Sequence, residues 1–249
     1  MKTVGMIIAR LGSTRLPQKA IRPLFGQPMI GRLIERVKHA RSLEGVALVT
    51  TTLPEDEKLV ALADAWGCLS FRGSPDNVSQ RIADAAQSLS CETVVELLAD
   101  NPLIHSDLID DVVDLYRSQK SDYAASVTVE YSHLPETLKR FPIGIRVQAY
   151  SARVASRWNE FPQFLNSPLG TTAFMFRQED QFRCAYLEAQ GKWGELLEPQ
   201  YHLAVNYQKN FDLIERIFAD LYPMDSNFSL PQVVRWMKNH QNLHHLMGS

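Results

Sequence analysis

Three cationic residues follow closely on the first apolar segment of the chain: Arg10, Arg15 and Lys19, with Gly12 among them. The apolar residues 3–8 predict a buried strand that ends just before this group. Cations within the reach of one loop can neutralise a polyanion such as a nucleoside triphosphate, and backbone N–H groups near a glycine can approach its phosphate oxygens. A solvated charged loop is the ordinary alternative, but the position after a buried strand favours phosphate binding.

A carboxylate follows a second buried segment in a similar way. Residues 93–98 predict another strand, and Asp100 comes directly after it. In a parallel sheet, ligands bind beyond the carboxyl ends of the strands, so Asp100 and the cationic loop are expected at the same edge. Taken alone, an aspartate in this place is more often a turn or helix-capping residue.

The elements that must position these residues alternate along the first half of the chain. This order predicts an α/β fold, a Rossmann-like α/β/α sandwich with a mostly parallel sheet, formed by residues 1–249 as one domain. The predicted strands are 3–8, 46–51, 69–72, 93–98 and 123–129, and the predicted helices are 28–40, 54–66, one beginning at 74–76, and one that Ser106 caps.

The second half has weaker periodicity and recurring prolines. Residues 130–200 predict a small antiparallel insertion that forms a wall of the site, a dimer contact or both. Within it we expect a helix at 150–158 and strands at 173–176 and 182–187. A core strand at 201–205 and helices at 211–221 and 229–240 complete the chain, with a frayed tail beyond them.

Composition excludes several functional classes. The 249 residues are 45% hydrophobic with a formal net charge of −2, so nothing suggests a protein that coats nucleic acid. Three dispersed cysteines, without a Cys-x-x-Cys pair, suggest neither a disulfide framework nor a zinc site. No apolar stretch approaches membrane-spanning length, and the first apolar run is too short for a signal peptide. We therefore expect a cytoplasmic protein without nucleic-acid or membrane partners.

Residues 7–19 resemble the signature of the cytidylyltransferase family, which includes the CMP-sugar synthetases for acidic sugars and the spore coat polysaccharide biosynthesis protein F group. Other motifs of the family follow in the same order, and the resemblance covers about the first 130 residues before it becomes looser. These motifs are Gly26-Gln27-Pro28-Met29-Ile30, residues 50–56, Phe71-Arg72-Gly73-Ser74 with Asn77, Val78 and Arg81, and Ala99-Asp100-Asn101-Pro102-Leu103-Ile104.

The resemblance implies Mg²⁺-dependent transfer of CMP from CTP to a sugar, with release of pyrophosphate, in cell-surface polysaccharide biosynthesis. It further implies a nucleotide-diphospho-sugar transferase type of fold and a homodimer. Arg10, Arg15 and Lys19 would act catalytically on the triphosphate, and Asp100 matches the carboxylate that binds Mg²⁺ in the family. The nucleotide-binding positions it implies are Ala9, Arg10, Gly12, Ser13, Arg15, Lys19, Arg72, Gly73 and Arg81.

The chain departs from the family pattern in its second half. Asn206 stands where the family has a second metal-binding aspartate; its amide oxygen can bind Mg²⁺, or it is a structural turn residue. Arg146 and Gln148, the candidate substrate-binding residues, lie in a stretch where the spore-coat group has acidic residues, and a family His-x-Thr segment reads Gly170-Thr171-Thr172 here. Arg146 suits the carboxylate of an acidic sugar, although a surface arginine or oligomer contact is the more ordinary interpretation.

These departures leave two alternatives open. One is a catalytically impaired nucleotide-binding homologue that serves as a sensor or assembly partner. The other is a nucleotidyltransferase that uses another nucleoside triphosphate, because the contacts that select a base cannot be placed from one sequence.

Overall fold

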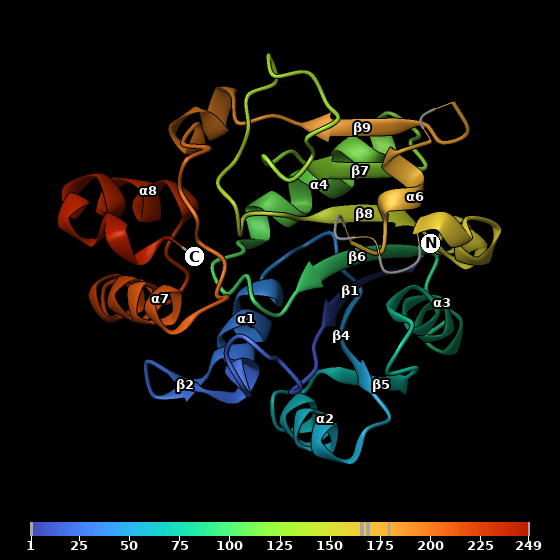
Figure 1. Ribbon diagram of the computed structural model, residues 1–249, viewed down its shortest axis with the longest axis horizontal. Helices are drawn as coiled ribbons and strands as arrows, with labels where there is room; N and C mark the ends of the chain where they lie inside the picture. Colours follow the sequence, from blue (N-terminus) through green and yellow to red (C-terminus); the bar gives the residue numbers. More distant parts are fainter. Residues whose placement is uncertain (1, 165–166, 168–169, 179, 249) are drawn as a thin grey trace.

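A seven-stranded sheet runs through the protein in the order β5-β4-β1-β6-β8-β7-β9 (Figure 1). The computed structural model describes residues 2–164, 167, 170–178 and 180–248. The strands are β1 (Thr3–Ile8), β4 (Gly45–Thr51), β5 (Leu69–Gly73), β6 (Thr93–Leu98), β7 (Tyr123–Ser126), β8 (Gln148–Ser151) and β9 (Cys184–Leu187). The short strands β2 (Pro23–Leu24) and β3 (Gln27–Pro28) form a separate antiparallel hairpin.

The sheet is mixed but mostly parallel. β1 pairs in parallel with both β4 and β6, and β4 pairs in parallel with β5. β8 lies antiparallel between β6 and β7, and β9 is parallel to β7 at the edge. The predicted α/β/α sandwich is confirmed, and residues 130–200 contribute β8 and β9 to this same sheet.

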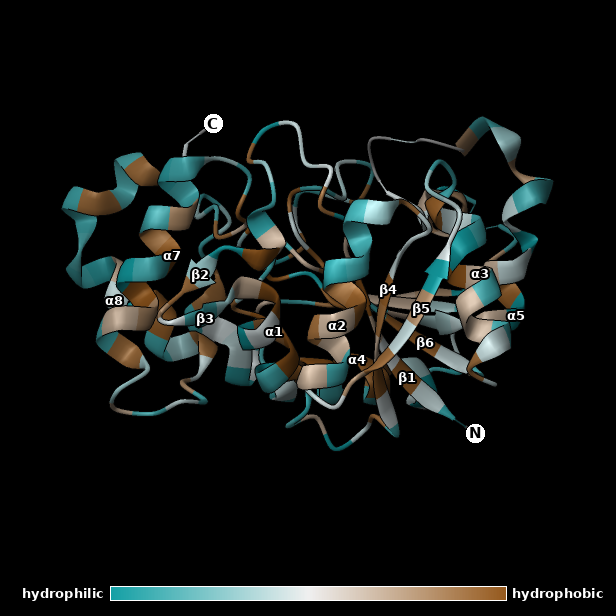
Figure 2. Cartoon of the chain, turned by 90° about the horizontal axis from the view of Figure 1, so that it is seen from below, coloured by the Kyte–Doolittle hydropathy of each residue, from teal (hydrophilic) through white to brown (hydrophobic). Residues whose placement is uncertain are grey.

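Two hydrophobic cores cover the two faces of the sheet. This follows from the composition of the central strands, which are apolar on both faces, as expected of parallel strands buried on both sides. Figure 2 shows hydrophobic residues concentrated on these strands and hydrophilic residues on the outer turns of the helices. One core receives α1 (Met29–Val37), α2 (Glu57–Ala65), α4 (Ser106–Ser118), α7 (Gln208–Leu221) and α8 (Leu230–Asn239). The other receives α3 (Val78–Ser88), α5 (Ala152–Ala155) and α6 (Ala173–Phe176).

Short 3₁₀ segments supplement these helices. They span Lys19–Ile21, Pro54–Asp56, Ser156–Glu160, Pro162–Phe164, Gly191–Leu196 and Gln241–Leu246. The last of these occupies the place where a frayed tail was predicted. In the part of the chain that the structure covers, no helix is both long and apolar enough to span a bilayer.

Three local predictions are wrong, and the bounds of a fourth differ. Residues 173–176 form α6 rather than a strand. The helix predicted at 150–158 begins at Ala152, because residues 150–151 end β8, and continues through the 3₁₀ segment Ser156–Glu160. Residues 201–205 form no strand; one isolated bridge joins His202 to Ile143. His105, rather than Ser106, caps α4, because its Nδ1 accepts the N–H of Asp107 at 3.1 Å.

Candidate functional site

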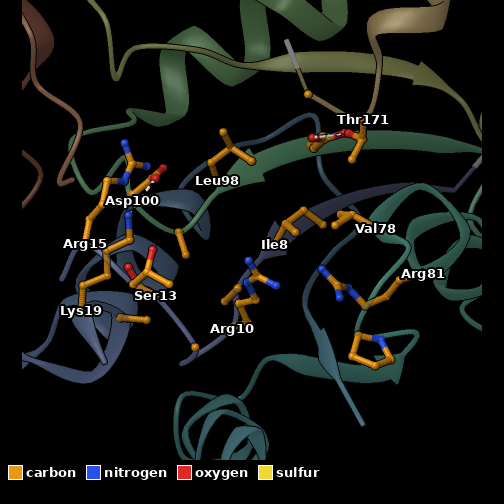
Figure 3. A pocket seen from close by; sticks show the side chains of 18 of the residues that line it. Ile8, Arg10, Ser13, Arg15, Lys19, Val78, Arg81, Leu98, Asp100 and Thr171 are labelled. Atoms are coloured by element: carbon orange, nitrogen blue, oxygen red, sulfur yellow. Dashed lines mark hydrogen bonds and ion pairs between the residues drawn. The ribbon is translucent and has the colours of Figure 1, made fainter. Parts of the chain in front are cut away.

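A cleft of about 530 Å³ opens at the carboxyl ends of β1 and β6 (Figure 3). Its walls come from the loop after β1, the start of α3, the end of β6, and residues of the 146–171 region. This is the sheet edge at which an open α/β fold binds ligands. The cleft contains the predicted residues Ala9, Arg10, Gly12, Ser13, Arg15, Lys19, Arg81, Asp100 and Arg146.

The loop after β1 is fixed at its base by a buried carboxylate. The Leu11 N–H donates to Asp56 Oδ1 at 2.7 Å, and the hydroxyl of Thr51 donates to the other oxygen of the same carboxylate. Asp56 is fully buried, so these bonds hold the start of the loop against the Pro54–Asp56 turn. Gly12 is exposed, and a Cβ there would meet nothing within 4 Å, so the loop is open at this point.

Two of the predicted backbone contacts to phosphate are already used within the protein. The Ala9 N–H donates to the Val49 carbonyl at 3.2 Å, and the Ser13 N–H donates to the Leu11 carbonyl at 2.8 Å. Both residues still line the cleft. Their N–H groups therefore shape the loop, and the loop offers its side chains rather than these two amides to a ligand.

The three cations of this loop have different surroundings. Lys19 Nζ lies 2.9 Å from Asp100 Oδ2 and 2.7 Å from the Val205 carbonyl oxygen. The guanidinium carbon of Arg15 lies 5.7 Å from the centroid of the Tyr207 ring. Arg10 and Arg15 are exposed, and Figure 3 shows both beside the cleft with Lys19. The predicted gathering of these cations around one space is confirmed.

Arg81 adds a fourth cation from the first turn of α3. Its side chain is almost completely buried, and Nη1 donates to the Ser74 carbonyl at 2.7 Å. Its Nε has no hydrogen-bond partner among the residues that the structure describes. Burial and the nearby charge of Arg10 lower the pKa of Arg81, while Asp56 opposes this shift. A buried cation that faces a second cation is stabilised when an anion binds between them.

Arg72 and Gly73 do not line the cleft, unlike the other predicted nucleotide-binding residues. Arg72 instead ties β5 to the segment before α2: its guanidinium donates to the Thr51 carbonyl at 3.0 Å and to the Leu53 carbonyl at 2.9 Å, and pairs with Glu57. A Cβ on Gly73 would lie 2.9 Å from Arg81 Cγ. Both residues are thus structural supports of the cleft in this conformation.

The two candidate metal ligands are linked through the backbone, and Asn206 is not among the described residues that line the cleft. The N–H of Val205, the residue before Asn206, donates to the Asp100 carbonyl at 2.8 Å. Asn206 Oδ1 is buried and has no hydrogen-bond partner in the described part of the chain. A buried, unpartnered amide oxygen, on a segment bonded to the backbone of Asp100, fits Mg²⁺, which prefers oxygen ligands. Across the described residues no cluster of three or more His, Cys, Asp or Glu exists, so phosphate oxygens and water would have to complete such a site.

The far end of the cleft contains a buried carboxylate that the sequence analysis missed. Glu96 lies within β6 and is 2% exposed. It accepts the hydroxyl of Tyr150 at 2.5 Å and that of Thr171 at 2.9 Å. Figure 3 shows Thr171 at this end of the cleft. Burial and this carboxylate raise the pKa of Tyr150 well above its usual value. One charged residue inside the apolar stretch 93–98 was the signal that could have revealed it, because a buried charge needs a reason.

Arg146 lies at the same end, but Gln148 does not line the cleft. Arg146 is 6% exposed, which excludes the surface interpretation; Nη1 lies 3.3 Å from Glu130 Oε1, and Nε lacks a partner among the described side chains. The amide oxygen of Gln148 instead accepts the hydroxyls of Tyr123 at 2.7 Å and Thr172 at 2.6 Å inside the core. Arg146 remains a candidate ligand contact, and Gln148 is a structural neighbour.

Comparison with known proteins gives a consistent picture. A family model described as "Cytidylyltransferase" matches residues 4–142. The spore coat polysaccharide biosynthesis protein SpsF of Bacillus subtilis is 23% identical over 224 residues, covering 86% of this chain and 85% of that protein. A 3-deoxy-manno-octulosonate cytidylyltransferase of Chloroherpeton thalassium is 35% identical over 116 residues, or 45% of each chain.

Solved structures show the same fold. A cytidylyltransferase from Leptospira borgpetersenii matches with a TM-score of 0.84 at 22% identity, covering 100% of this chain and 98% of that one. A CMP:2-keto-3-deoxy-manno-octonic acid synthetase complexed with CTP matches with a TM-score of 0.60 at 15% identity, covering 88% and 99%. The sheet of this chain is therefore that of the nucleotide-diphospho-sugar transferases.

Proposed function

Because the chain belongs to the cytidylyltransferase family, we propose that it transfers CMP from CTP to a sugar hydroxyl and releases pyrophosphate. The observation that carries this proposal is the set of four cations, Arg10, Arg15, Lys19 and Arg81, around one cleft that also contains Asp100. The likeness to a spore coat polysaccharide protein supports a role in cell-surface polysaccharide biosynthesis.

The cations would bind the triphosphate and stabilise charge as it develops on the leaving pyrophosphate. Phosphoryl and nucleotidyl transfer need positioning and charge neutralisation more than a protein nucleophile. Arg10 and Arg15 are exposed at the mouth and can adjust to the phosphates, whereas the buried Arg81 is held by the Ser74 carbonyl. Fixed donors of this kind lose little freedom when the reaction proceeds.

Asp100 and Asn206 would hold Mg²⁺, which when bound neutralises phosphate oxygens and orients them for attack. In the structure the Asp100 carboxylate accepts a hydrogen bond from Lys19. The Lys19 ammonium is thus positioned to transfer its hydrogen bond from that carboxylate to a phosphate oxygen when nucleotide enters. This arrangement keeps a partly buried carboxylate paired in the free protein.

The far end of the cleft would bind the acceptor sugar. Glu96 and Leu98 share one face of β6, because side chains alternate along a strand, and both line the cleft. Glu96 can accept sugar hydroxyls, and the unpartnered Nε of Arg146 suits the carboxylate of an acidic sugar. Thr171 places residues of the 130–200 segment at this wall, which supports its predicted role as the sugar side of the site.

Binding and turnover test this proposal separately. Calorimetric titration with CTP, UTP, GTP and ATP in Mg²⁺ should show CTP as the preferred ligand, and pyrophosphate release should require CTP together with an acidic sugar such as 3-deoxy-manno-octulosonate or a related acid. The variant Glu96→Gln should leave CTP affinity within about twofold while lowering pyrophosphate release, because it changes only the acceptor end. A protein that neither binds CTP nor releases pyrophosphate with any acidic sugar would refute the proposal.

The neutral Asn206 favours one competing function, a nucleotide-binding protein without turnover. A neutral ligand binds Mg²⁺ less strongly than a carboxylate does. This alternative predicts tight CTP binding without pyrophosphate release, in the wild type and in Asn206→Asp alike. Loss of a measured activity in Asn206→Ala would exclude it.

A further inference from the structure

One short loop, residues 205–207, contacts Asp100 and the cations Lys19 and Arg15 at the phosphate end of the cleft. The N–H of Val205 donates to the Asp100 carbonyl at 2.8 Å, and its carbonyl accepts from Lys19 Nζ at 2.7 Å. The Tyr207 ring lies beside the guanidinium of Arg15. The position of this loop therefore determines where the amide side chain of Asn206 lies relative to the Asp100 carboxylate and to the cations Lys19 and Arg15.

A single buried side chain fixes the loop. Asn210, the third residue of α7, is 1% exposed. Its Oδ1 accepts the N–H of Asn206 at 3.1 Å and the N–H of Tyr207 at 2.9 Å. Two residues of the loop thus depend on one amide oxygen, since backbone N–H groups at a helix start have no partner within the helix.

The other end of the same amide holds a distant segment. Asn210 Nδ2 donates to the carbonyls of Leu246, Met247 and Gly248 at 2.9, 3.3 and 3.2 Å. An asparagine amide accepts through its oxygen and donates through its nitrogen, and a carboxylate of the same shape can only accept. Both functions of the side chain are used here, one toward the 205–207 loop and one toward residues 246–248.

Residues 241–248 are docked by further contacts around this amide. The Met247 carbonyl lies 2.9 Å from His202 Nδ1, and the His244 ring packs edge-on against Tyr201 with 5.2 Å between centroids. The side chains of Leu243, Leu246 and Met247 pack against the main core. The segment therefore covers the backbone that leads into the 205–207 loop as well as the start of α7.

We propose that Asn210 is a positioning residue that couples docking of residues 241–248 to the position of the 205–207 loop, and so of the Asn206 amide, relative to Asp100. The metal-binding half of the cleft is then complete only while this segment is docked. The inference rests on the proposed function, because it assigns the segment to the metal-dependent part of CTP binding. It adds a second location, outside the cleft, from which that binding is controlled.

The variant Asn210→Asp separates the two functions of the side chain. The carboxylate still accepts the N–H groups of the loop and suits a helix N-terminus, but it cannot donate to the three carbonyls and repels them. We expect faster hydrogen exchange in residues 241–248 and at the amides of Asn206 and Tyr207. CTP affinity in Mg²⁺ should fall about tenfold, in the range seen when groups that orient metal ligands are removed. In EDTA it should change less than about threefold, since the cations remain.

Gln232→Glu is the matched control, because Gln232 Oε1 caps α8 by accepting the Ser229 N–H at 2.7 Å and a carboxylate keeps that bond. A second variant, which deletes residues 247–249, removes two of the three carbonyls that Asn210 binds without changing α7. If exchange shows the segment released in either variant while CTP affinity in Mg²⁺ stays at the wild-type value, the coupling does not exist. If wild-type CTP binding is itself independent of Mg²⁺, the proposed function fails instead, whatever the variants show.

Discussion

Replacing Lys19 with methionine should change metal binding and nucleotide binding in opposite directions. In the free protein the Lys19 ammonium lies 2.9 Å from Asp100 Oδ2, with the two side chains 13% and 24% exposed. It therefore competes with any cation for this carboxylate. The same ammonium is one of the cations available to the triphosphate, so its loss must also weaken CTP binding.

The magnitude follows from the geometry of the pair. Two unit charges about 4 Å apart attract by roughly 4 kcal/mol at an effective dielectric constant of about 20. Partial exposure and the cost of removing both charges from water reduce this to about 1–2 kcal/mol. Lys19→Met should therefore bind a divalent cation about tenfold more tightly without nucleotide, because about 1.4 kcal/mol corresponds to a factor of ten. CTP affinity should fall by about ten- to a hundredfold, the value of a hydrogen bond to a charged group.

Mn²⁺ is a suitable probe, because the free ion is counted directly by electron paramagnetic resonance, and calorimetry gives the CTP affinity. Lys38→Met is the matched control: Lys38 Nζ donates to the Trp66 carbonyl at 2.6 Å, away from the cleft. A folded Lys19→Met protein that binds Mn²⁺ no better than the wild type would show that Asp100 is not the metal ligand. Unchanged CTP affinity would show that Lys19 does not meet the phosphates.

Three further predictions concern burial and backbone conformation. Arg81→Met should leave the melting temperature nearly unchanged, because burial already disfavours the charge of Arg81. The same variant should weaken CTP binding at least about tenfold, as measured by calorimetry. A lower melting temperature with unchanged CTP affinity would give Arg81 a purely structural role. Gly144→Ala should lower the free energy of unfolding in urea by about 2–4 kcal/mol, since φ is +92° and a Cβ would lie 2.5 Å from the carbonyl carbon of Leu203. A decrease below about 1 kcal/mol would contradict this geometry. Burial raises the pKa of Cys68 and of Cys91 from 9.0 to about 11, so the unfolded chain loses these protons first. The free energy of unfolding should thus be intact below pH 9 and fall as the pH rises toward 11, by about 2–3 kcal/mol per thiol; equal urea midpoints at pH 8 and 10.5 would exclude this effect.

The first half of the fold could be predicted because its signals are local and agree with each other. Residues 3–8 and 93–98 are apolar runs with polar residues after them, and the helices between them have apolar residues at helical spacing. In the structure these two strands pair in parallel, which places Asp100 and the cationic loop at one edge. The rule that the carboxyl ends of parallel strands meet at one edge of the sheet was sufficient to predict that Lys19 and Asp100, 81 positions apart, lie close together.

The second half could not be predicted in the same way, because its local signals are ambiguous. The run at 173–176 is apolar and four residues long, too short to distinguish a buried helical turn from a strand. Residues 201–205 are apolar enough for a strand, but their sheet-type pairing within the described part of the chain is limited to one isolated bridge between His202 and Ile143. Whether a segment pairs with another strand depends on where the tertiary fold places it, and the sequence pattern does not specify that placement.

The sequence was least informative about the site where a residue type has two uses. Arg72 follows the motif order of a nucleotide-binding loop, yet its guanidinium is occupied by the Thr51 and Leu53 carbonyls. Glu96 was overlooked because the strand around it is otherwise apolar, although a charge there needs partners, and Tyr150 and Thr171 supply them. For both Arg72 and Glu96, the role of the side chain depends on which groups form hydrogen bonds with it. Those partner groups belong to segments distant in the sequence.

The position of β8 between β6 and β7 imposes an order on assembly. β1, β4, β5 and β6 can pair as soon as residue 98 has been synthesised, but β7 must wait, since its neighbours β8 and β9 both lie later in the chain. Until residues 148–151 emerge, β6 is an open edge, the kind of surface on which nascent chains aggregate. The four cations and Asp100 therefore emerge early in synthesis, whereas Arg146 and the 205–207 loop that contacts Lys19 and Arg15 emerge late. A chain interrupted between these points would contain the cations of the cleft while exposing an unpaired strand.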